Sequence, residues 1–278
     1  MESAKLHIEG AKHRPETIKH YLDFIDRRDY DSVEDVMNDV YRETGLDIVN
    51  TKGMQTTLAK LGIVEQSDRQ QLTARGRELI DVLLHDEELF RELLHFNYAT
   101  AYHRNPSPDR AISWAYYQIS NELRRRSPTD FSGARQEIVE AVGKKAKQSS
   151  DESLADPGPL SPGSLNNYQR FIEQLEPTVF DDATGDFTLR SFARSELVLA
   201  VIDHLYRTDV DSATREYGDP MRFPDDTVEL LCSILLVQEE DLADVIEHVA
   251  LMDARLSITP DYELSVRLSN PVEINDLA

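Results

Sequence analysis

The chain has 278 residues and a formal net charge of −22, and 40% of its residues are hydrophobic. That length suffices for two modest domains, and the apolar content exceeds that of disordered chains. No run of about eighteen apolar residues is present, which excludes a transmembrane helix, and the start of the chain lacks the apolar core of a secretion signal. The one cysteine, Cys232, cannot form an internal disulfide. We therefore expect a cytoplasmic protein without membrane association.

The first predicted domain spans residues 1–86 and is mainly helical. Apolar residues three and four positions apart predict helices within 16–28, 32–45 and 50–62. Gly62 is the expected end of the third helix, because glycine readily adopts the left-handed conformation that closes many helices. The fold class expected for the whole chain is likewise mainly α, with small hairpins.

A short hairpin is expected directly after the third helix. The runs IVEQ and RQQL predict two strands, and Ser67 with Asp68 predicts the turn between them. Thr73 suits the N-terminal cap of a fourth helix, since its hydroxyl can accept a hydrogen bond from a backbone N–H of the first turn. The expected order is therefore three helices, a hairpin and a fourth helix.

Residues 87–147 are expected to form a helical domain that packs on the first one. Two aromatic-rich, amphipathic helices are predicted on either side of Pro106 and Pro108, because proline interrupts helical structure. A third helix follows, and we expect it to fray at Gly143, since glycine weakens a helix interior.

Composition changes at residues 148–164, where serine, proline, glycine and aspartate predominate. Such a segment buries little apolar surface and predicts a linker between domains. The C-terminal domain, 165–278, is expected to be helical, with a β-hairpin where apolar residues alternate around Pro260 and Asp261. Its order of helices and then a hairpin echoes that of the first domain.

Residues 53–84 combine a helix ending in Leu-Gly, a hairpin, and Leu-Thr-x-x-Gly at the start of another helix. This pattern resembles the second half of a winged helix-turn-helix domain, and the matching positions are Leu58, Leu61, Gly62, Ile63, Leu72, Thr73 and Gly76. These residues fix the fold and do not touch DNA. The resemblance implies a winged helix in 1–86. For 165–278, a second winged helix is an alternative to another helical arrangement.

The resemblance also implies which residues face DNA, because the helix before the wing enters the major groove in this family. Glutamine and threonine can read base edges, and lysine and arginine can meet the backbone. Carried over by position, the candidate DNA-binding residues are Lys52, Gln55, Thr56, Lys60, Arg69, Arg75 and Arg77. The alternative is that the same domain packs against another protein.

The acidic composition does not exclude a nucleic-acid partner. The chain has 52 acidic residues, 22 arginines and eight lysines, a balance that resembles proteins of salt-accumulating, halophilic archaea. In about 1 M salt the Debye length falls to about 3 Å, so repulsion between distant charges is screened. Basic runs at 12–14, 124–126 and 144–147 indicate either phosphate contacts or solvated helix ends.

A second resemblance covers residues 72–123. The motif Leu-Leu-His-Phe-x-x-Ala, followed by a helix with Ala-x-x-Trp-x-Tyr, is similar to the central part of an uncharacterised family. That family is encoded beside DNA phosphorothioation and related antiviral defence systems. The resemblance implies a role in such an assembly and transfers no catalytic residue. The same aromatic residues would also serve an ordinary helical core.

Enzyme signatures are missing from the sequence: it has no phosphate-binding lysine loop, no dinucleotide glycine fingerprint and no nucleophile elbow. His95 and His103 lie in an aromatic stretch, where packing is expected rather than metal ligation. We therefore expect no catalytic residue, no metal and no cofactor.

The leading hypothesis is a non-catalytic DNA-binding or DNA-recognition protein. Its expected partners are double-stranded DNA and other protein subunits, within an archaeal antiviral defence or DNA-modification assembly or as a transcription regulator. The alternative is a protein–protein scaffold that uses winged helices as docking modules.

Overall fold

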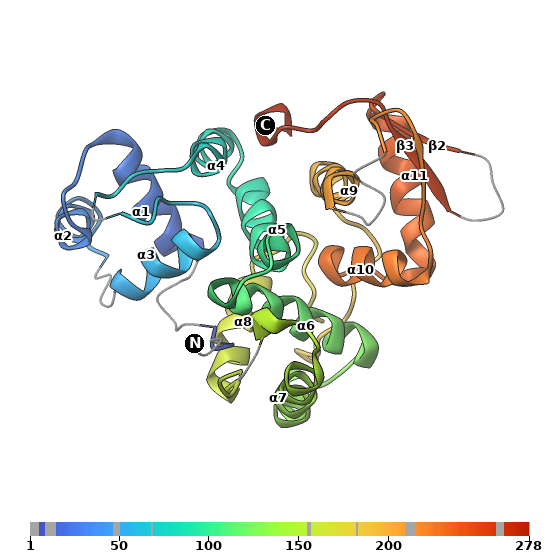
Figure 1. The fold of residues 1–278 in the computed structure, drawn as a ribbon, viewed down its shortest axis with the longest axis horizontal. Helices are drawn as coiled ribbons and strands as arrows, with labels where there is room; N and C mark the ends of the chain where they lie inside the picture. The colour runs from blue at the N-terminus through green and yellow to red at the C-terminus, as the bar shows by residue number, and fades with distance from the viewer. Residues whose placement is uncertain are drawn as a thin grey trace.

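The computed structural model describes residues 6–8, 15–46, 51–67, 69–154, 157–181, 183–208, 215–259 and 264–277. Within these ranges the chain is mainly α, as expected, with eleven α-helices and one three-stranded sheet. The N-terminal and C-terminal helices lie on opposite sides of the central helix α5 (Figure 1). None of the helices described here is both long and apolar enough to cross a membrane.

The N-terminal group of helices follows the predicted apolar spacing: α1 Pro15–Arg27, α2 Val33–Thr44, α3 Thr51–Lys60 and α4 Ala74–His85. Ser32 caps α2, because its side chain accepts a hydrogen bond from the Asp35 N–H group, and Gly45 ends the helix in the left-handed conformation. The apolar side of α3 faces the core, where Met54, Leu58 and the following Leu61 are buried. Local caps and burial thus position α3 on the outside of the group.

The hairpin between α3 and α4 is shorter than predicted. It consists of an isolated antiparallel bridge between Val64 and Leu72, with no extended strand among its described residues. Tyr30, between α1 and α2, forms a second bridge with Gln70. The Tyr30 bridge was not predicted, because its two residues are far apart in the sequence and neither belongs to an alternating apolar run.

The middle of the chain forms four helices: α5 Glu87–Arg104, α6 Ala111–Arg126, α7 Phe131–Gln148 and α8 Pro162–Ile172. The expectation that α5 is amphipathic was wrong, because nearly every residue from Leu89 to Tyr102 is buried. The expected fraying at Gly143 was also wrong. The helix α7 continues to Gln148 because Val142 and Ala146 bury their side chains on its inner face.

The segment 148–164 packs on the helices around it. Leu154 and Leu160 are buried, and the Tyr102 hydroxyl donates a hydrogen bond to Asp151 at 2.5 Å. Residues 6–8 also cross to this part of the fold, where the Ile8 N–H group donates to the Ser164 hydroxyl at 3.1 Å. The segment therefore contributes to the core, while the division of the chain into domains at this point stays a prediction.

The C-terminal helices are α9 Ser195–Thr208, α10 Asp225–Leu235 and α11 Leu242–Met252, with strands β1 Pro220–Arg222, β2 Leu256–Ile258 and β3 Ser265–Leu268. The sheet is antiparallel, in the order β1-β3-β2. Leu256 faces Leu268 in the register, and Ile258 faces Val266, in agreement with the predicted hairpin. Pro260 and Asp261 at its turn lie outside the described residues.

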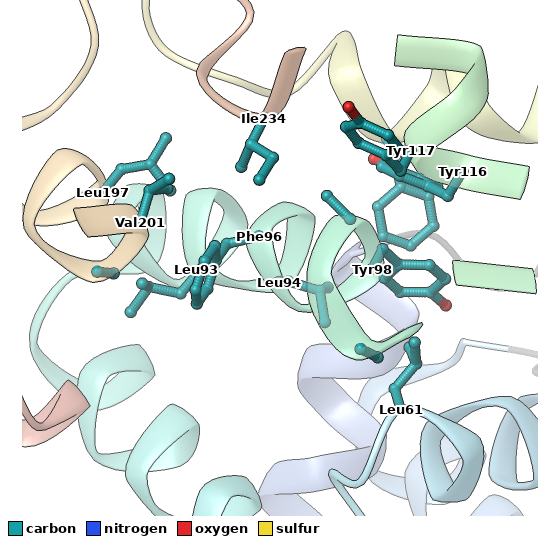
Figure 2. Close-up of a cluster of buried hydrophobic side chains, with 14 of the residues drawn as sticks. Leu61, Leu93, Leu94, Phe96, Tyr98, Tyr116, Tyr117, Leu197, Val201 and Ile234 are labelled. Atoms are coloured by element: carbon teal, nitrogen blue, oxygen red, sulfur yellow. The ribbon is translucent and has the colours of Figure 1, made fainter. Parts of the chain in front are cut away.

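One continuous hydrophobic core joins these groups, with α5 at its centre. Figure 2 shows Leu93 and Phe96 of α5 beside Leu197 and Val201 of α9, with Ile234 of α10 nearby. Burial of this apolar surface is the main favourable contribution to folding. The N-terminal and C-terminal groups are therefore held through a shared helix.

A buried ion pair also links α5 to the segment before α9. Both oxygens of the Glu92 carboxylate accept hydrogen bonds from the Arg190 guanidinium, at 2.7 and 3.0 Å. Arg190 donates a further bond to the Leu235 carbonyl, and Glu92 accepts one from the Glu176 N–H group. The pair is almost completely removed from solvent. These extra hydrogen bonds offset the desolvation cost of burying two charges.

Candidate nucleic-acid interface

The end of α3 is fixed by a glycine-based helix cap. Gly62 has a φ of +75°, and its N–H group donates to the Ala59 carbonyl, while the Ile63 N–H group donates to the Leu58 carbonyl, both at 2.9 Å. This pair of bonds is the Schellman motif, which satisfies carbonyls left free at a helix end. The chain then turns directly into the hairpin, so the outer face of α3 and the hairpin turn are held together.

Thr73 and Gly76 join the hairpin to α4. The Thr73 hydroxyl donates to the Gly62 carbonyl at 2.7 Å and accepts from the Gly76 N–H group at 3.1 Å. A Cβ atom at Gly76 would lie 2.1 Å from the Ile63 carbonyl oxygen, so only glycine permits this approach. The Leu-Thr-x-x-Gly motif is therefore explained by packing between the hairpin and α4.

The exposed face of α3 and the hairpin turn enclose a shallow hollow of about 360 Å³. Its described lining residues carry no carboxylate and are Gln55, Thr56, Ala59, Lys60, Gln66 and Ser67. The Gln55 amide donates to the Ser67 carbonyl at 3.2 Å, which ties the helix to the turn. Lys60 lies at the edge, with its ammonium 3.9 Å from the exposed carboxylate of Asp109. The structure thus brings together three of the seven candidate DNA-binding residues.

Arg69 and Arg77 lie in different surroundings. Arg69 is exposed at the hairpin turn, close in sequence to Ser67, whose hydroxyl donates to the Arg69 carbonyl at 2.7 Å. Arg77 is exposed as well, but it lines a separate hollow that also contains Asp26 and Asp29. Arg69 therefore lies in the hairpin turn next to Ser67, which lines the hollow, whereas Arg77 belongs to a more acidic surface.

Arg75 does not join the face of α3, contrary to the expected grouping. Its Nε donates a hydrogen bond to the Asn97 side chain of α5, and its guanidinium lies 5.7 Å from the centre of the Phe96 ring. Burial lowers the pKa of Arg75 to about 10. The first turn of α4 directs this side chain towards α5. Lys52 lies in the first turn of α3, but its side chain is outside the described part of the chain.

The other basic runs are largely engaged within the molecule. Arg124 and Arg125 form ion pairs with Glu229, and Lys145 lies 2.8 Å from a carboxylate oxygen of Glu122. The run at 12–14 lies outside the described residues. Intramolecular pairing agrees with the alternative that these runs are ordinary helix ends.

His95 is a packing residue in the core, as expected. The Ile234 carbonyl can only accept, so Nε2 of His95 donates to it at 2.8 Å, and Nδ1 accepts from the Tyr116 hydroxyl at 2.8 Å. Burial lowers the pKa of His95 to about 4, which keeps the ring neutral. His103 packs edge-on against Tyr117. Among the described residues, no group of three or more His, Cys, Asp and Glu side chains is arranged to hold a metal ion.

The helix α11 occupies the place in the C-terminal group that α3 has in the N-terminal group, between a helix and a hairpin. Its outward residues include Asp244 and Glu247, and no lysine or arginine occurs in the helix. Leu251 and Met252 at its end are 79% and 72% exposed. This surface is acidic and apolar, in contrast to the polar face of α3.

A cluster that sequence analysis missed lies between α4, α5, α9 and the C-terminal turn η4, Ile274–Leu277. It includes Arg75, Arg104 and Arg207 around a pocket of about 150 Å³. Arg75 and Arg104 come from the consecutive helices α4 and α5, whereas Arg207 comes from α9, much later in the sequence. No motif connects them, and only the fold brings them together.

Comparison of the chain with protein-family models, with curated proteins and with solved structures found no match.

Proposed function

We propose that residues 15–85 are a winged helix-turn-helix domain that contacts duplex DNA through the exposed face of α3. The observation that carries this proposal is the composition of that face. Residues 53–61 contain no aspartate or glutamate, although the whole chain has 52 acidic residues. The domain assignment is supported by the order of the elements: α1, the β-bridge residue Tyr30, α2, α3 and then the short hairpin.

The side chains on this face have the chemistry that groove recognition needs. Gln55 can form two hydrogen bonds with an adenine edge, and Thr56 can bond to a base of either type. Lys60 and Arg69 flank these residues and can meet backbone phosphates. Gln55 must then give up its bond to the Ser67 carbonyl, so base reading competes with an internal contact of moderate length.

The proposed interface is small, and its affinity depends on salt. Each phosphate contact lowers the slope of log affinity against log salt concentration by about 0.9. The reason is that a lysine or arginine that neutralises a phosphate releases a counterion from the DNA. With two flanking cations, the proposal predicts a shallow salt slope. Contacts to base edges, which concentrated salt weakens less, carry a larger share of the affinity.

The proposal is tested by fluorescence anisotropy with a labelled DNA duplex. The measurement is made at several salt concentrations that keep the protein folded. The combined variant Gln55→Ala, Lys60→Ala and Arg69→Ala is expected to bind at least tenfold more weakly, equivalent to about 1.4 kcal/mol. Its unfolding free energy is expected to change by less than about 1 kcal/mol, because these side chains lie at the surface.

The control is the combined variant Arg42→Ala and Lys147→Ala, which removes two exposed cations on other helices. It is expected to bind like the wild type. The proposal is rejected if the two variants bind DNA equally well, or if the wild type binds no duplex at any salt concentration that preserves its fold.

A second candidate function is protein docking through the C-terminal group. Leu251 and Met252 expose two large apolar side chains at the end of α11, beside its acidic face. Large apolar residues on a surface commonly mark an interaction site. We propose that a winged-helix-like arrangement of α9–α11 serves protein contact, while α3 serves DNA. Both surfaces are compatible with a defence, DNA-modification or regulatory assembly.

Replacement of Leu251 and Met252 by serine tests the docking function. In a pull-down from a nuclease-treated, high-salt lysate, the variant is expected to lose a partner that the wild type retains. Equal recovery of all proteins by both chains would remove the support for docking through α11.

A further inference from the structure

The pocket between α4, α5, α9 and the C-terminal turn has an unusual balance of charge. It is lined by three arginines and three carboxylates, together with apolar side chains and His204. Its volume of about 150 Å³ is smaller than the 300 Å³ or so of pockets for drug-sized ligands. A ligand of this pocket is therefore a small molecule or ion.

Two of the arginines have only neutral hydrogen-bond partners. The Arg75 Nε and the Arg104 guanidinium both donate to the Asn97 side-chain oxygen, and Arg104 also donates to the Thr100 hydroxyl at 3.1 Å. Within the described part of the chain, no carboxylate oxygen lies within 4.0 Å of either guanidinium. Charged groups away from water are normally paired with an opposite charge, so these two cations lack their usual compensation.

The electrostatic environment agrees with this lack of compensation. Burial, together with the neighbouring charges of Arg75 and Arg110, lowers the pKa of Arg104 to about 8. Burial also lowers the pKa of Arg75, against the attraction of Glu78. Since arginine does not release its proton in proteins, the two guanidiniums stay charged and repel each other.

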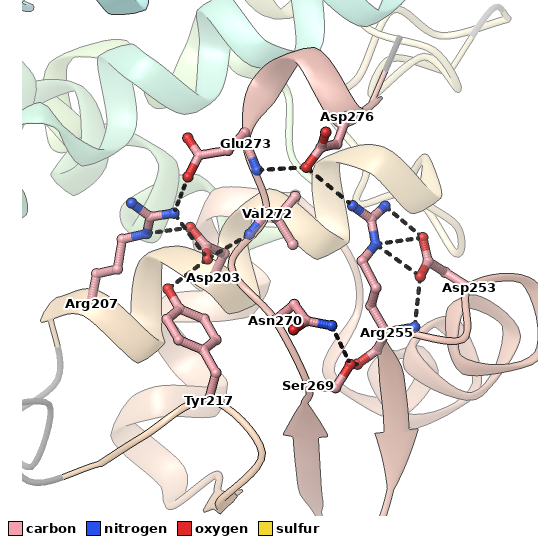
Figure 3. A network of polar contacts seen from close by, with 10 residues as sticks. All are labelled: Asp203, Arg207, Tyr217, Asp253, Arg255, Ser269, Asn270, Val272, Glu273 and Asp276. Atoms are coloured by element: carbon pink, nitrogen blue, oxygen red, sulfur yellow. Dashed lines mark hydrogen bonds and ion pairs between the residues drawn. The ribbon is translucent and has the colours of Figure 1, made fainter.

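The pocket carboxylates are engaged elsewhere or disfavoured as ions. Asp203 accepts from Arg207 at 2.7 Å, from the Tyr217 hydroxyl at 2.8 Å and from the Val272 N–H group at 3.0 Å (Figure 3). Glu273 lies 3.4 Å from the same Arg207 guanidinium. Burial raises the pKa of Glu78, because removal from water makes its charged form less stable. Arg75 and Arg104 are therefore the two pocket arginines that no described carboxylate contacts directly.

His204 supplies a third polar group, with a ring nitrogen that has no hydrogen-bond partner in the described structure. Its side chain is 4% exposed, and its Nε2 atom is buried without a hydrogen-bond partner in the described structure. Burial and the nearby arginines lower the pKa of His204 well below its usual value, so the ring is neutral. A neutral imidazole can donate one hydrogen bond, and a buried nitrogen without a partner costs free energy.

We infer that this pocket binds a small oxyanion of the phosphate class, with Arg75 and Arg104 as the cationic ligands and His204 as a hydrogen-bond donor. Guanidinium groups match the geometry of phosphate oxygens, and an anion would compensate both charges at once. Because α4, α5, α9 and η4 all border the pocket, the bound anion would tie the N-terminal group to the C-terminal group. The inference is independent of DNA binding through α3.

The inference is tested by isothermal titration calorimetry of the full chain with inorganic phosphate. The ionic strength is kept constant and high with potassium chloride. The wild type is expected to bind one phosphate per chain in a saturable manner. The variant Arg104→Gln is expected to bind at least tenfold more weakly. Arg91→Gln is the matched control, since Arg91 lies on the same helix but pairs with Glu87 at the surface. It is expected to bind like the wild type.

Thermal unfolding separates a ligand site from a structural role of Arg104. Without phosphate, Arg104→Gln is expected to melt no lower than the wild type, because it removes an uncompensated charge. With phosphate, the wild type is expected to melt higher, and the variant is not. If Arg104→Gln does not fold, Arg75→Gln and His204→Asn are tested in the same way.

Two results would overturn the inference. One is the absence of saturable phosphate binding to the wild type, or equal binding by wild type and pocket variants. The other is binding of acetate as tight as that of phosphate, which would replace the phosphate class by a carboxylate.

Discussion

At the scale of single residues, the buried polar groups differ in how far the sequence predicts them. His95 is held neutral between a carbonyl and a hydroxyl, and Glu92 and Arg190 form a fully buried ion pair. The aromatic surroundings of His95 predicted its burial, but nothing in the sequence pairs Glu92 with Arg190. Such pairs depend on tertiary contacts, which hydrophobic periodicity does not describe.

The depressed pKa of His95 predicts a loss of stability in acid. In the unfolded chain the ring titrates near pH 6.5, whereas burial lowers its folded pKa to about 4. Between these values the unfolded state binds more protons, so the stability present above pH 6.5 is lost as the pH falls towards 4. The loss is about 1.4 kcal/mol per pH unit for one such group.

Urea denaturation at a series of pH values checks this prediction. The variant His95→Gln keeps a donor for the Ile234 carbonyl but does not titrate. It is expected to lose less stability than the wild type between pH 6.5 and 4.5. Parallel curves for the two chains would show that His95 does not control the acid response.

At the scale of elements, the spacing of apolar residues predicted the helices α1–α3 and the final hairpin, and Thr73 predicted the start of α4. Caps such as Ser32 and Gly62 act over a few residues, and the local sequence specifies them. The bridge of Tyr30 to Gln70 and the continuation of α7 past Gly143 depend on neighbours far along the chain. The same limit applies to the candidate DNA face, where the side-chain direction of Arg75 is set by α5.

Two glycines in helices are expected to respond in opposite directions to alanine. Gly76→Ala places a methyl group against the Ile63 carbonyl and is expected to cost roughly 1–3 kcal/mol, as overpacking does. Gly143→Ala, in α7, has open space within 4 Å and is expected to stabilise by about 0.5–1 kcal/mol. Urea denaturation at fixed salt measures both. Equal effects of the two substitutions would contradict the close approach at Gly76.

At the scale of the whole molecule, the spacing of apolar residues predicted the helical class but not the shared core. The segment 148–164 has the composition of a linker, yet Leu154 and Leu160 bury their side chains. Two apolar residues in a polar segment suffice to attach it, and composition averages conceal them. The pocket of Arg75, Arg104 and Arg207 was missed for a related reason, because only the complete fold brings these residues into one place.

The net charge of −22 predicts that the fold depends on salt. At about 0.01 M salt the Debye length is about 30 Å, so carboxylates across the molecule repel one another. We expect the helical circular dichroism signal and the melting temperature to fall as potassium chloride is removed. A melting temperature that is constant across the salt series would argue against adaptation to concentrated salt.

The contact between η4 and α4 has a consequence for the order in which the protein folds during synthesis. Ile274 and Leu277 are buried, and η4 packs on α4, which is made much earlier. The face of α4 that receives η4 therefore stays uncovered until residues 274–277 have left the ribosome. Contacts between such distant parts of a chain slow folding, since a long loop must close first. The N-terminal helices can form early on the nascent chain, but the final packing of α4 requires the synthesis of η4.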